Sequence, residues 1–349
     1  MKLAGWGRFP KVETTIVTPH FHEDIREQVL KGSLIARGNG RSYGDSAVNK
    51  DTTLHMKRLN KMISFNPADG QLVAQAGVML ADVINTFLPR GWFPFVTPGT
   101  KFVTLGGMAA TDVHGKNHHS EGSFVQHIDW VDLMTPDGRV RRCSRQENAE
   151  LFHWTIGGMG LTGVILTIAC RLRKVSTSWI RQNTIAAQNL DAAIDVFEQT
   201  LSSTYAVAWI DCLGRGRQLG RSLIMLGEHA QHYELPDERQ NKPFDIPHRK
   251  STTVPFELPS LTLNRWSVGL FNNIYYWIGA RRPRHSLIDY ETYFYPLDTL
   301  HGWNKIYGRR GFAQFQCAIP LGQSTSGLRQ ILETVSQSSS GAFLAVLKR

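Results

Sequence analysis

The first half of the chain alternates apolar and polar positions in short stretches that are separated by turn-forming residues. Stretches 61–66 and 71–77 flank a Pro-Ala-Asp-Gly sequence, and stretches 130–135 and 139–143 flank a Pro-Asp-Gly sequence. These turn residues between alternating stretches predict two β-hairpins. Apolar residues then recur at helical spacing over 80–88. Strands and helices of this kind predict an α+β first half.

A long apolar stretch over 163–174 predicts the strand that ends this half, with a boundary near 175–178. The second half has its own layout. Residues 190–201 predict a helix and 205–213 predict a strand, whereas the polar, proline-containing stretch from 236 to 259 is typical of a loop. Residues 343–349 predict a further strand. We therefore expect two structural units.

Residues 261–279 are apolar and aromatic, but polar residues interrupt them and arginines follow. The interruptions and the arginines are Asn264, Arg265, Asn272, Asn273, Arg281, Arg282 and Arg284. Two interpretations remain open. The segment could lie on a membrane surface, or it could pack within the second unit, which is the commoner fate of an aromatic stretch.

Composition adds charge to this picture. The chain has 349 residues, 42% of them hydrophobic, and a formal net charge of +10. This composition excludes a disordered chain and favours an anionic partner, which nucleic acid, acidic lipid head groups and a phosphorylated substrate satisfy equally well. Residues 1–10 lack an apolar signal core and no apolar run could span a bilayer, so we expect a cytoplasmic protein or one peripheral to the membrane.

Two nucleotide-binding motifs are excluded. Residues 158–163 match the pattern GxGxxG, but a helical stretch over 149–156 precedes them and a strand follows. This order is the reverse of that in a Rossmann turn. A Walker A sequence is absent, which removes support for nucleotide hydrolysis. No zinc-finger, helix-turn-helix or RRM signature supports nucleic-acid binding.

Three glycine-rich segments carry most of the candidate chemistry: 37–45, 98–115 and 157–163. Each exposes backbone N–H groups that no side chain obstructs. Several such segments at one site could hold a pyrophosphate and let the backbone approach a flat ring. Their joint occurrence predicts a site for a large dinucleotide cofactor.

In their order these segments resemble the FAD-binding domain of the vanillyl-alcohol oxidase / p-cresol methylhydroxylase superfamily. Residues 36–45 match its first phosphate loop, 97–115 its second flavin-binding segment, and 157–165 the strand that ends the domain. The resemblance implies an α+β, two-subdomain FAD-binding domain over 1–176. An antiparallel-sheet substrate (cap) domain over 177–349 would follow and would be incomplete at its C-terminus.

Within the superfamily, residues 111–124, 311–316 and 343–348 resemble the branch of decaprenylphosphoryl-β-D-ribose 2′-oxidases. That resemblance implies oxidation of a secondary alcohol of a polyprenyl-phosphate-linked pentose to the keto sugar. A partner reductase would act on the product, and the protein could touch the membrane. Two alternatives are an aldonolactone or sugar-alcohol oxidase of the same superfamily and a non-catalytic basic protein that binds membrane surfaces.

The resemblance also implies the cofactor site. Many relatives attach FAD to a histidine at the position of Arg41, so we expect non-covalent FAD. The expected FAD-binding residues are Ala36, Arg37, Gly38, Asn39, Gly40, Arg41, Ser42, Tyr43, Gly44, Asp45, Ser46, Gly99, Thr104, Leu105, Gly106, Gly107, Thr111, Asp112, Val113, His114 and Ile165.

The expected catalytic residues are His114, Lys116, Lys348, Gln314, Gln316 and Tyr43. Lysines serve phosphate as point charges, so Lys116 and Lys348 would bind the substrate phosphate. Gln314 and Gln316 are two apart on a predicted strand and would face the sugar together. Tyr43 would close one side of the site.

Other residues of chemical interest have simpler interpretations. Four histidines, His114, His118, His119 and His127, lie within fourteen residues, but no carboxylate or cysteine completes a known ligand spacing, so we expect no metal. The cysteines are scattered without a CxxC pattern. We interpret Cys143, Cys170, Cys212 and Cys317 as reduced thiols of the core.

Overall fold

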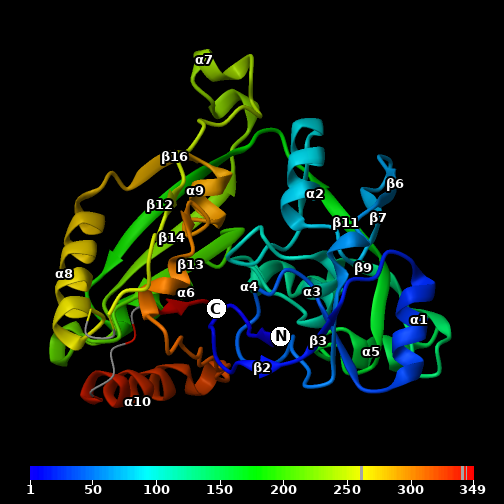
Figure 1. Cartoon of the computed structure of the whole chain (residues 1–349). Coiled ribbons are helices and arrows are strands. Elements are labelled where there is room, and N and C mark those ends of the chain that lie inside the picture. The colour runs from blue at the N-terminus through cyan, green and yellow to red at the C-terminus, as the bar shows by residue number, and fades with distance from the viewer. Residues whose placement is uncertain (260–261, 339–341, 343) are drawn as a thin grey trace.

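The long strand β11 (Val164–Lys174) organises the first half of the chain (Figure 1). The computed structural model describes residues 1–259, 262–338, 342 and 344–349. Four antiparallel strands build the first sheet around β11, together with β8 at its far end. They are β9 (Ile128–Met134), β10 (Val140–Ser144), β7 (Gln71–Gln75), β6 (Met62–Asn66) and β8 (Trp92–Pro94). Both predicted hairpins are confirmed.

Helices pack against this sheet because their apolar residues recur on one side. In α2 (Leu80–Phe87) the buried residues include Leu80, Val83, Ile84 and Phe87, at spacings of three and four. This helix and α5 (Ala149–Thr155) confirm the helices expected over 80–88 and 149–156. The short helix α3 (Leu105–Ala110) lies within the second glycine-rich segment, and α4 (His118–Glu121) follows it.

A small parallel sheet carries the first glycine-rich loop. Strand β5 (Thr52–His55) pairs with β3 (Thr15–Val17) on one side and with β4 (Leu34–Arg37) on the other. Helix α1 (His22–Lys31) provides the crossover, and its fully buried Ile25 joins the core beneath the sheet. Strand β4 therefore ends where the glycine-rich loop begins. Strands β1 (Lys2–Leu3) and β2 (Val12–Glu13) form a separate ribbon.

The second half contains an antiparallel five-stranded sheet. Its order is β16 (His285–Asp289), β12 (Trp179–Ala187), β14 (Ser222–His229), β13 (Tyr205–Ile210) and β18 (Val346–Leu347). Its main helices are α6 (Leu190–Gln199), α8 (Arg265–Arg281), α9 (Tyr290–Phe294) and α10 (Ser324–Gln337). The helix and strand expected from 190 and 205 are confirmed, and the chain is α+β throughout. The division at residue 176 stays a prediction.

Three expectations for the second half need correction. Residues 311–320 form no strand, because no described strand pairs with their backbone. Of the strand expected over 343–349, only Val346–Leu347 pairs with β13, and residue 343 lies outside the described residues. The expected loop over 236–259 contains the short helix α7 (Asp237–Gln240) and strand β15 (Thr252–Thr253), which pairs with β17 (Leu300–His301).

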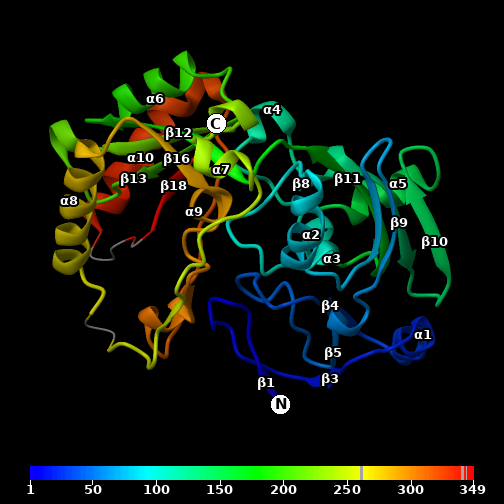
Figure 2. The same ribbon diagram turned by 90° about the horizontal axis from the view of Figure 1, so that it is seen from above.

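A shared aromatic core joins the two sheets. The fully buried ring of Phe93 comes from β8, and its centroid lies 5.4 Å from that of Phe294 in α9. Phe294 in turn meets Tyr205 of β13, edge to face, at 4.9 Å. Such ring pairs contribute about 0.5–1.5 kcal/mol each beyond their buried area. Figure 2 shows α9 between the second sheet and the elements of the first.

Polar contacts attach helix α8 to the second sheet. Buried Asp211 and Arg221 form an ion pair at 2.7 Å. Asn272 of α8 donates from Nδ2 to Asp211 at 2.7 Å, and the Arg221 guanidinium donates to Oδ1 of Asn273 at 2.7 Å. The segment expected over 261–279 thus packs on the sheet with one side, while residue 261 lies outside the described residues. No helix among the described residues is long and apolar enough to cross a membrane.

We predict that Arg221→Leu lowers the free energy of unfolding by about 3–5 kcal/mol, because it leaves the Asp211 carboxylate buried without its cation. Urea denaturation of the purified protein measures this change. The control is Arg329→Leu, since the ion pair of Arg329 with Asp191 is exposed and its loss should cost at most about 1 kcal/mol. Equal effects of the two variants would contradict the prediction.

Candidate functional site

The first glycine-rich loop lies directly against the second glycine-rich segment. A Cβ on Gly38 would overlap with Oγ1 of Thr104, so only glycine permits this approach. Beside it, the Asn39 amide donates from Nδ2 to the carbonyl of Phe102 at 2.8 Å. These two contacts join segments that are more than sixty residues apart in the sequence.

The third glycine-rich segment packs against the second segment and against the strand that leads into the first loop. The N–H of Gly157 donates to the carbonyl of Ala109 at 3.0 Å, and that of Met159 donates to the carbonyl of Ala110 at 2.8 Å. Gly160 packs close to Ile35 at the base of the first loop. The predicted convergence of the three segments is therefore present in the structure.

The first loop has the backbone and the open space that a phosphate ligand requires. Gly40 and Gly44 have φ angles of +65° and +64°, which favour glycine. The Arg37 guanidinium holds the loop by donating to the carbonyls of Ala4 and Ala47. The buried hydroxyl of Ser42 has no hydrogen-bond partner among the described residues.

Two further observations fit a large ligand along these segments. Apart from the adjoining residues of the chain, no described atom lies within 4 Å of the position that a Cβ on Gly44 or Gly99 would occupy, so open space adjoins both loops. A buried, unpaired hydroxyl usually indicates a missing partner. Together, the Ser42 hydroxyl, the positive-φ glycines and this open space fit the pyrophosphate of a dinucleotide.

Contacts with aromatic rings hold the first loop against the N-terminal segment and against the second half of the chain. The guanidinium carbon of Arg41 lies 3.9 Å from the centroid of the Trp6 ring, a distance at which cation–π attraction operates. The Tyr43 ring lies 5.4 Å from that of Phe312. Burial raises the pKa of Tyr43, so its phenol stays protonated at neutral pH. Tyr43 is thus placed where it could close one side of a site.

Several expected FAD-binding residues stabilise the second glycine-rich segment through hydrogen bonds. Thr104 caps α3 by accepting from the N–H of Gly107 at 3.2 Å, and the Thr111 hydroxyl donates to the Gly107 carbonyl at 2.8 Å. The Asp112 carboxylate accepts from Ser123 and from the N–H of Val125, at 2.7 and 2.8 Å. These contacts fix the turn that leads to His114.

The remaining expected cofactor residues differ in their exposure. Leu105 and Ile165 are buried in the core of the first sheet, and Val113 packs against it. Asp45 is exposed, whereas Ala36 and Ser46 are half-buried. A Cβ on Gly106 would meet Ala76, so this glycine allows α3 to approach the sheet.

His114 and Gln316 meet across the two halves of the molecule. The Gln316 amide lies 3.1 Å from Nε2 of His114, and Gln314 donates from Nε2 to Oε1 of Gln316 at 3.3 Å. Burial, followed by the nearby charges of Lys348 and His118, lowers the pKa of His114 to about 4. His114 is therefore neutral at physiological pH and accepts the amide hydrogen at Nε2.

The ammonium groups of Lys116 and Lys348 lie close enough to interact electrostatically, and Lys348 also acts on His114. Lys116 donates from Nζ to the carbonyl of Tyr293, and this ammonium lies 4.3 Å from the centroid of the Tyr293 ring. Burial and the charge of Lys348 lower the pKa of Lys116 to about 7, and burial also lowers the pKa of Lys348. Within the described part of the chain, neither lysine forms an ion pair.

Figures 1 and 2 both place the C-terminal residues beside α4, which follows Lys116 in the sequence. Strand β18 brings the end of the chain there by pairing with β13. From the same strand β13, the N–H of Ala206 donates to the carbonyl of Lys116 at 2.7 Å. The second sheet thus fixes both lysine-bearing segments.

Some expected roles change in the structure. Gln314 and Gln316 were expected on a strand but lie on an irregular, exposed segment. The orientation of Gln316 therefore comes from its hydrogen bond with His114. Cys317 on the same segment is exposed and is not part of the core, because no sheet covers it, whereas the other three cysteines are buried thiols.

The other three histidines have separate partners. His119 is hydrogen-bonded to the carbonyl of Ser203 at 2.7 Å. His127 stacks on Phe95 at 4.3 Å, and His118 meets His114 edge to face. No group of three or more potential metal ligands occurs among the described residues.

The sequence analysis did not identify Asn117 and Tyr295, whose hydrogen bonds hold the second glycine-rich segment and the chain just before it in place. The fully buried Asn117 donates from Nδ2 to the Phe95 carbonyl at 2.8 Å, while its Oδ1 has no described partner. Thr97 shares a hydrogen bond with the buried phenol of Tyr295. Asn117 lies inside the 111–124 motif and could have been found, but nothing in the sequence marks Tyr295.

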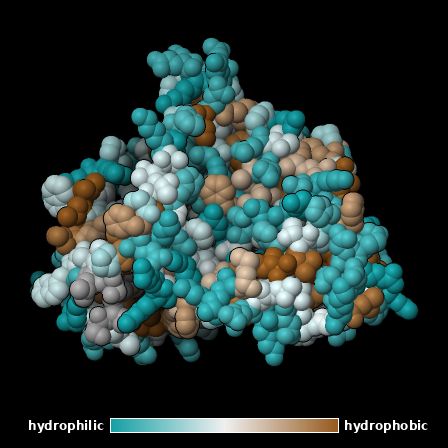
Figure 3. All heavy atoms as spheres, in the orientation of Figure 1, coloured by the Kyte–Doolittle hydropathy of each residue, from teal (hydrophilic) through white to brown (hydrophobic). Residues whose placement is uncertain are grey.

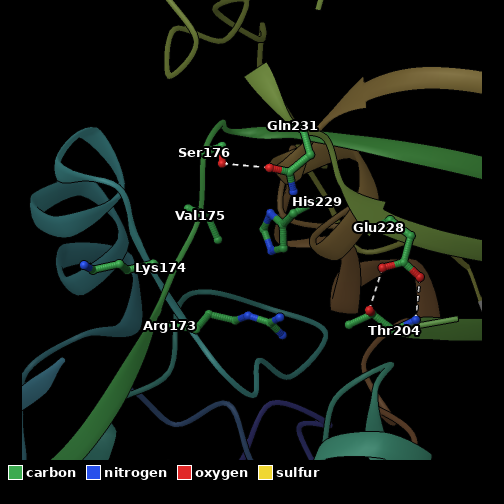
Figure 4. A pocket seen from close by; sticks show the side chains of 8 residues that line it. All are labelled: Arg173, Lys174, Val175, Ser176, Thr204, Glu228, His229 and Gln231. Atoms are coloured by element: carbon green, nitrogen blue, oxygen red, sulfur yellow. Dashed lines mark hydrogen bonds between the residues drawn. The ribbon is translucent and has the colours of Figure 1, made fainter. Parts of the chain in front are cut away.

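A separate hollow of about 140 Å³ lies at the junction of β11 and the second sheet. It is lined by Arg173, Lys174, Val175, Ser176, Thr204, Glu228, His229 and Gln231 (Figure 4). Burial and Arg173 lower the pKa of His229 to about 3, so its ring is neutral. No expected site residue lines this hollow, and it is small for an organic ligand.

Comparisons with known proteins agree with this geometry. A family model described as an FAD binding domain matches residues 16–144. The chain is 31% identical to decaprenylphosphoryl-beta-D-ribose oxidase of Mycolicibacterium smegmatis, over 99% of this chain and 77% of that protein. It is 32% identical to an uncharacterised protein of Streptomyces coelicolor, over 78% of this chain and 75% of that protein.

A third similarity, to L-gulonolactone oxidase of Bos taurus, is 29% identity over 38% of this chain and 30% of that protein. The fold, the glycine-rich site and these relatives define an FAD-dependent oxidoreductase. The chain belongs to the family that includes the mycobacterial decaprenylphosphoryl-ribose oxidase. FAD is accordingly its cofactor, and the loops described above are suited to hold it.

We predict that Gly38→Ala raises the dissociation constant for FAD at least about tenfold, which corresponds to about 1.4 kcal/mol. The added methyl group would push the first loop away from Thr104. Fluorescence titration of the flavin-free protein with FAD measures the change. Gly322→Ala is the matched control, because nothing lies within 4 Å of its added Cβ; equal affinities in the two variants would contradict the prediction.

Proposed function

We propose that this enzyme oxidises a secondary alcohol of a sugar that carries a lipid-linked phosphate, with a polyprenyl-phosphate-linked pentose as the substrate. The observation that carries this proposal is the pair of ammonium groups on Lys116 and Lys348. Both residues are half-buried, and neither has a carboxylate partner among the described residues. A phosphate group would supply the negative charge that this part of the site lacks.

The neighbouring groups suit a sugar. Gln314 and Gln316 have amides that can hydrogen-bond hydroxyl groups, and the neutral ring of His114 stands next to them. Oxidation of a secondary alcohol removes a hydride from its carbon and a proton from its oxygen. FAD, when bound, supplies the hydride acceptor. The protein residues hold the sugar in place and exclude water from it.

The similarity to the mycobacterial enzyme supports this substrate class over an aldonolactone. That similarity extends over 99% of this chain and so spans the segment that carries Gln314 and Gln316. The similarity to L-gulonolactone oxidase covers only 38% of the chain. The keto sugar that forms would be a substrate for a separate reductase.

Anaerobic mixing with farnesylphosphoryl-β-D-ribose tests the proposal, with loss of the flavin's visible absorbance as the readout. We expect this compound to reduce the flavin and free ribose to fail at equal concentration. Lys116→Met and Lys348→Met should each raise the half-saturating concentration about tenfold, since each removes one charge-assisted contact.

Lys50→Met is the control for these two variants, because Lys50 is an exposed lysine outside the site. Faster reduction by L-gulono-1,4-lactone would overturn the proposed substrate in favour of the lactone. Absence of reduction by every sugar would overturn the proposal as a whole.

We also propose that FAD is held without a covalent bond. Arg41 occupies the position where many members of the superfamily carry the linking histidine, and its guanidinium stacks on Trp6. Acid precipitation of the purified protein should therefore leave the yellow colour in the supernatant. Colour that remains with the pellet would show a covalent bond and contradict this inference.

A further inference from the structure

Helix α8 turns a row of large apolar side chains away from the protein. The exposed fractions are 87% for Trp266, 62% for Leu270, 50% for Ile274, 56% for Trp277 and 42% for Ile278. Because these five residues recur at spacings of three and four, they lie on one side of the helix. We call them the α8 stripe. Figure 3 shows the hydrophobic surface over α8 at the left edge of the molecule.

The opposite side of the helix accounts for its attachment to the sheet. Val268 and Asn272 are buried there, and Asn272 belongs to the polar contacts with Asp211 described above. Further along, the Tyr276 phenol donates to the carbonyl of Ala187 at 3.2 Å, and Gly279 packs against Leu223. These contacts attach the helix to the sheet. Among the described residues, the side chains of the α8 stripe take no part in this attachment and remain exposed.

Positive charge surrounds the stripe. Residues 258–288 contain four arginines and no aspartate or glutamate. Arg281 lies over the Trp277 ring, with its guanidinium carbon 3.9 Å from the ring centroid. Arg282 and Arg284 are exposed just beyond the end of the helix. An apolar row with tryptophans, edged by arginines, has the chemistry of a helix that lies at a lipid–water boundary.

We propose that the α8 stripe docks on the surface of a membrane that contains anionic lipids, with the helix parallel to the membrane plane. The stripe enters the acyl boundary, and the arginines contact the phosphate head groups. A second copy of the chain fits this surface less well. A two-fold contact would bring arginine-bearing helices together with no carboxylate between them. The proposal goes beyond the reaction proposed above and does not depend on it.

Co-sedimentation with sucrose-loaded vesicles tests the proposal on the full chain with FAD bound. The vesicles contain phosphatidylcholine alone or with about a quarter phosphatidylglycerol. We expect binding to the anionic vesicles that weakens with added salt. The double variant Trp266→Ser/Trp277→Ser should lower the partition coefficient about tenfold or more. Arg281→Gln/Arg282→Gln should also lower it and reduce its dependence on salt.

The control is Phe21→Ser/Leu30→Ser, which removes two exposed apolar side chains from the first half of the chain and should leave the partition unchanged. Leu270→Gln/Ile274→Gln is a second, independent stripe variant. Flavin content and thermal unfolding confirm that each variant is folded. The proposal is overturned if the wild type fails to bind anionic vesicles or if folded stripe variants bind as the control does. It is also overturned if sedimentation equilibrium shows a dimer that these variants dissociate.

Discussion

The packing of Phe294 between Phe93 and Tyr205 fixes the first and second sheets relative to each other. The candidate site depends on this contact because its residues come from both sides. The second sheet binds the Lys116 backbone through Ala206 and carries Lys348 at the end of its edge strand. A displacement of about 1 Å between reacting groups can lower a rate about a hundredfold. The same buried rings that stabilise the fold therefore also set the geometry of the candidate site.

The charges of the two lysines make the candidate site suited to an anion. Burying an ammonium group is costly unless a negative charge neutralises it. Burial lowers the pKa of both Lys116 and Lys348, and the charge of Lys348 lowers that of Lys116 further. A phosphate on the substrate would relieve this cost, whereas a neutral sugar would not. In the proposed function, discrimination between the two would thus arise from the unpaired charge of the protein itself.

The sequence predicted features that local chemistry determines, and it failed where distant partners decide. Turn residues located both hairpins, and the glycine-rich segments marked the loops that converge. The strand predicted to carry Gln314 and Gln316 was wrong, because the residues of a segment cannot show whether another strand is present to pair with it. Tyr295 was missed since its contact with Thr97 spans almost two hundred residues. The apolar stretch of α8 was visible, but hydropathy alone could not show which of its sides the sheet covers.

A titration without turnover measures whether an anion binds at the two lysines. A short polyprenyl phosphodiester that lacks the sugar would be added to the flavoprotein while the flavin spectrum is recorded between about pH 6 and 9. The diester keeps one negative charge throughout, whereas Lys116 loses its charge as the pH rises through its pKa of about 7. We expect saturable binding that weakens above this pKa. Binding that is absent, or that is equally strong at every pH, would contradict it.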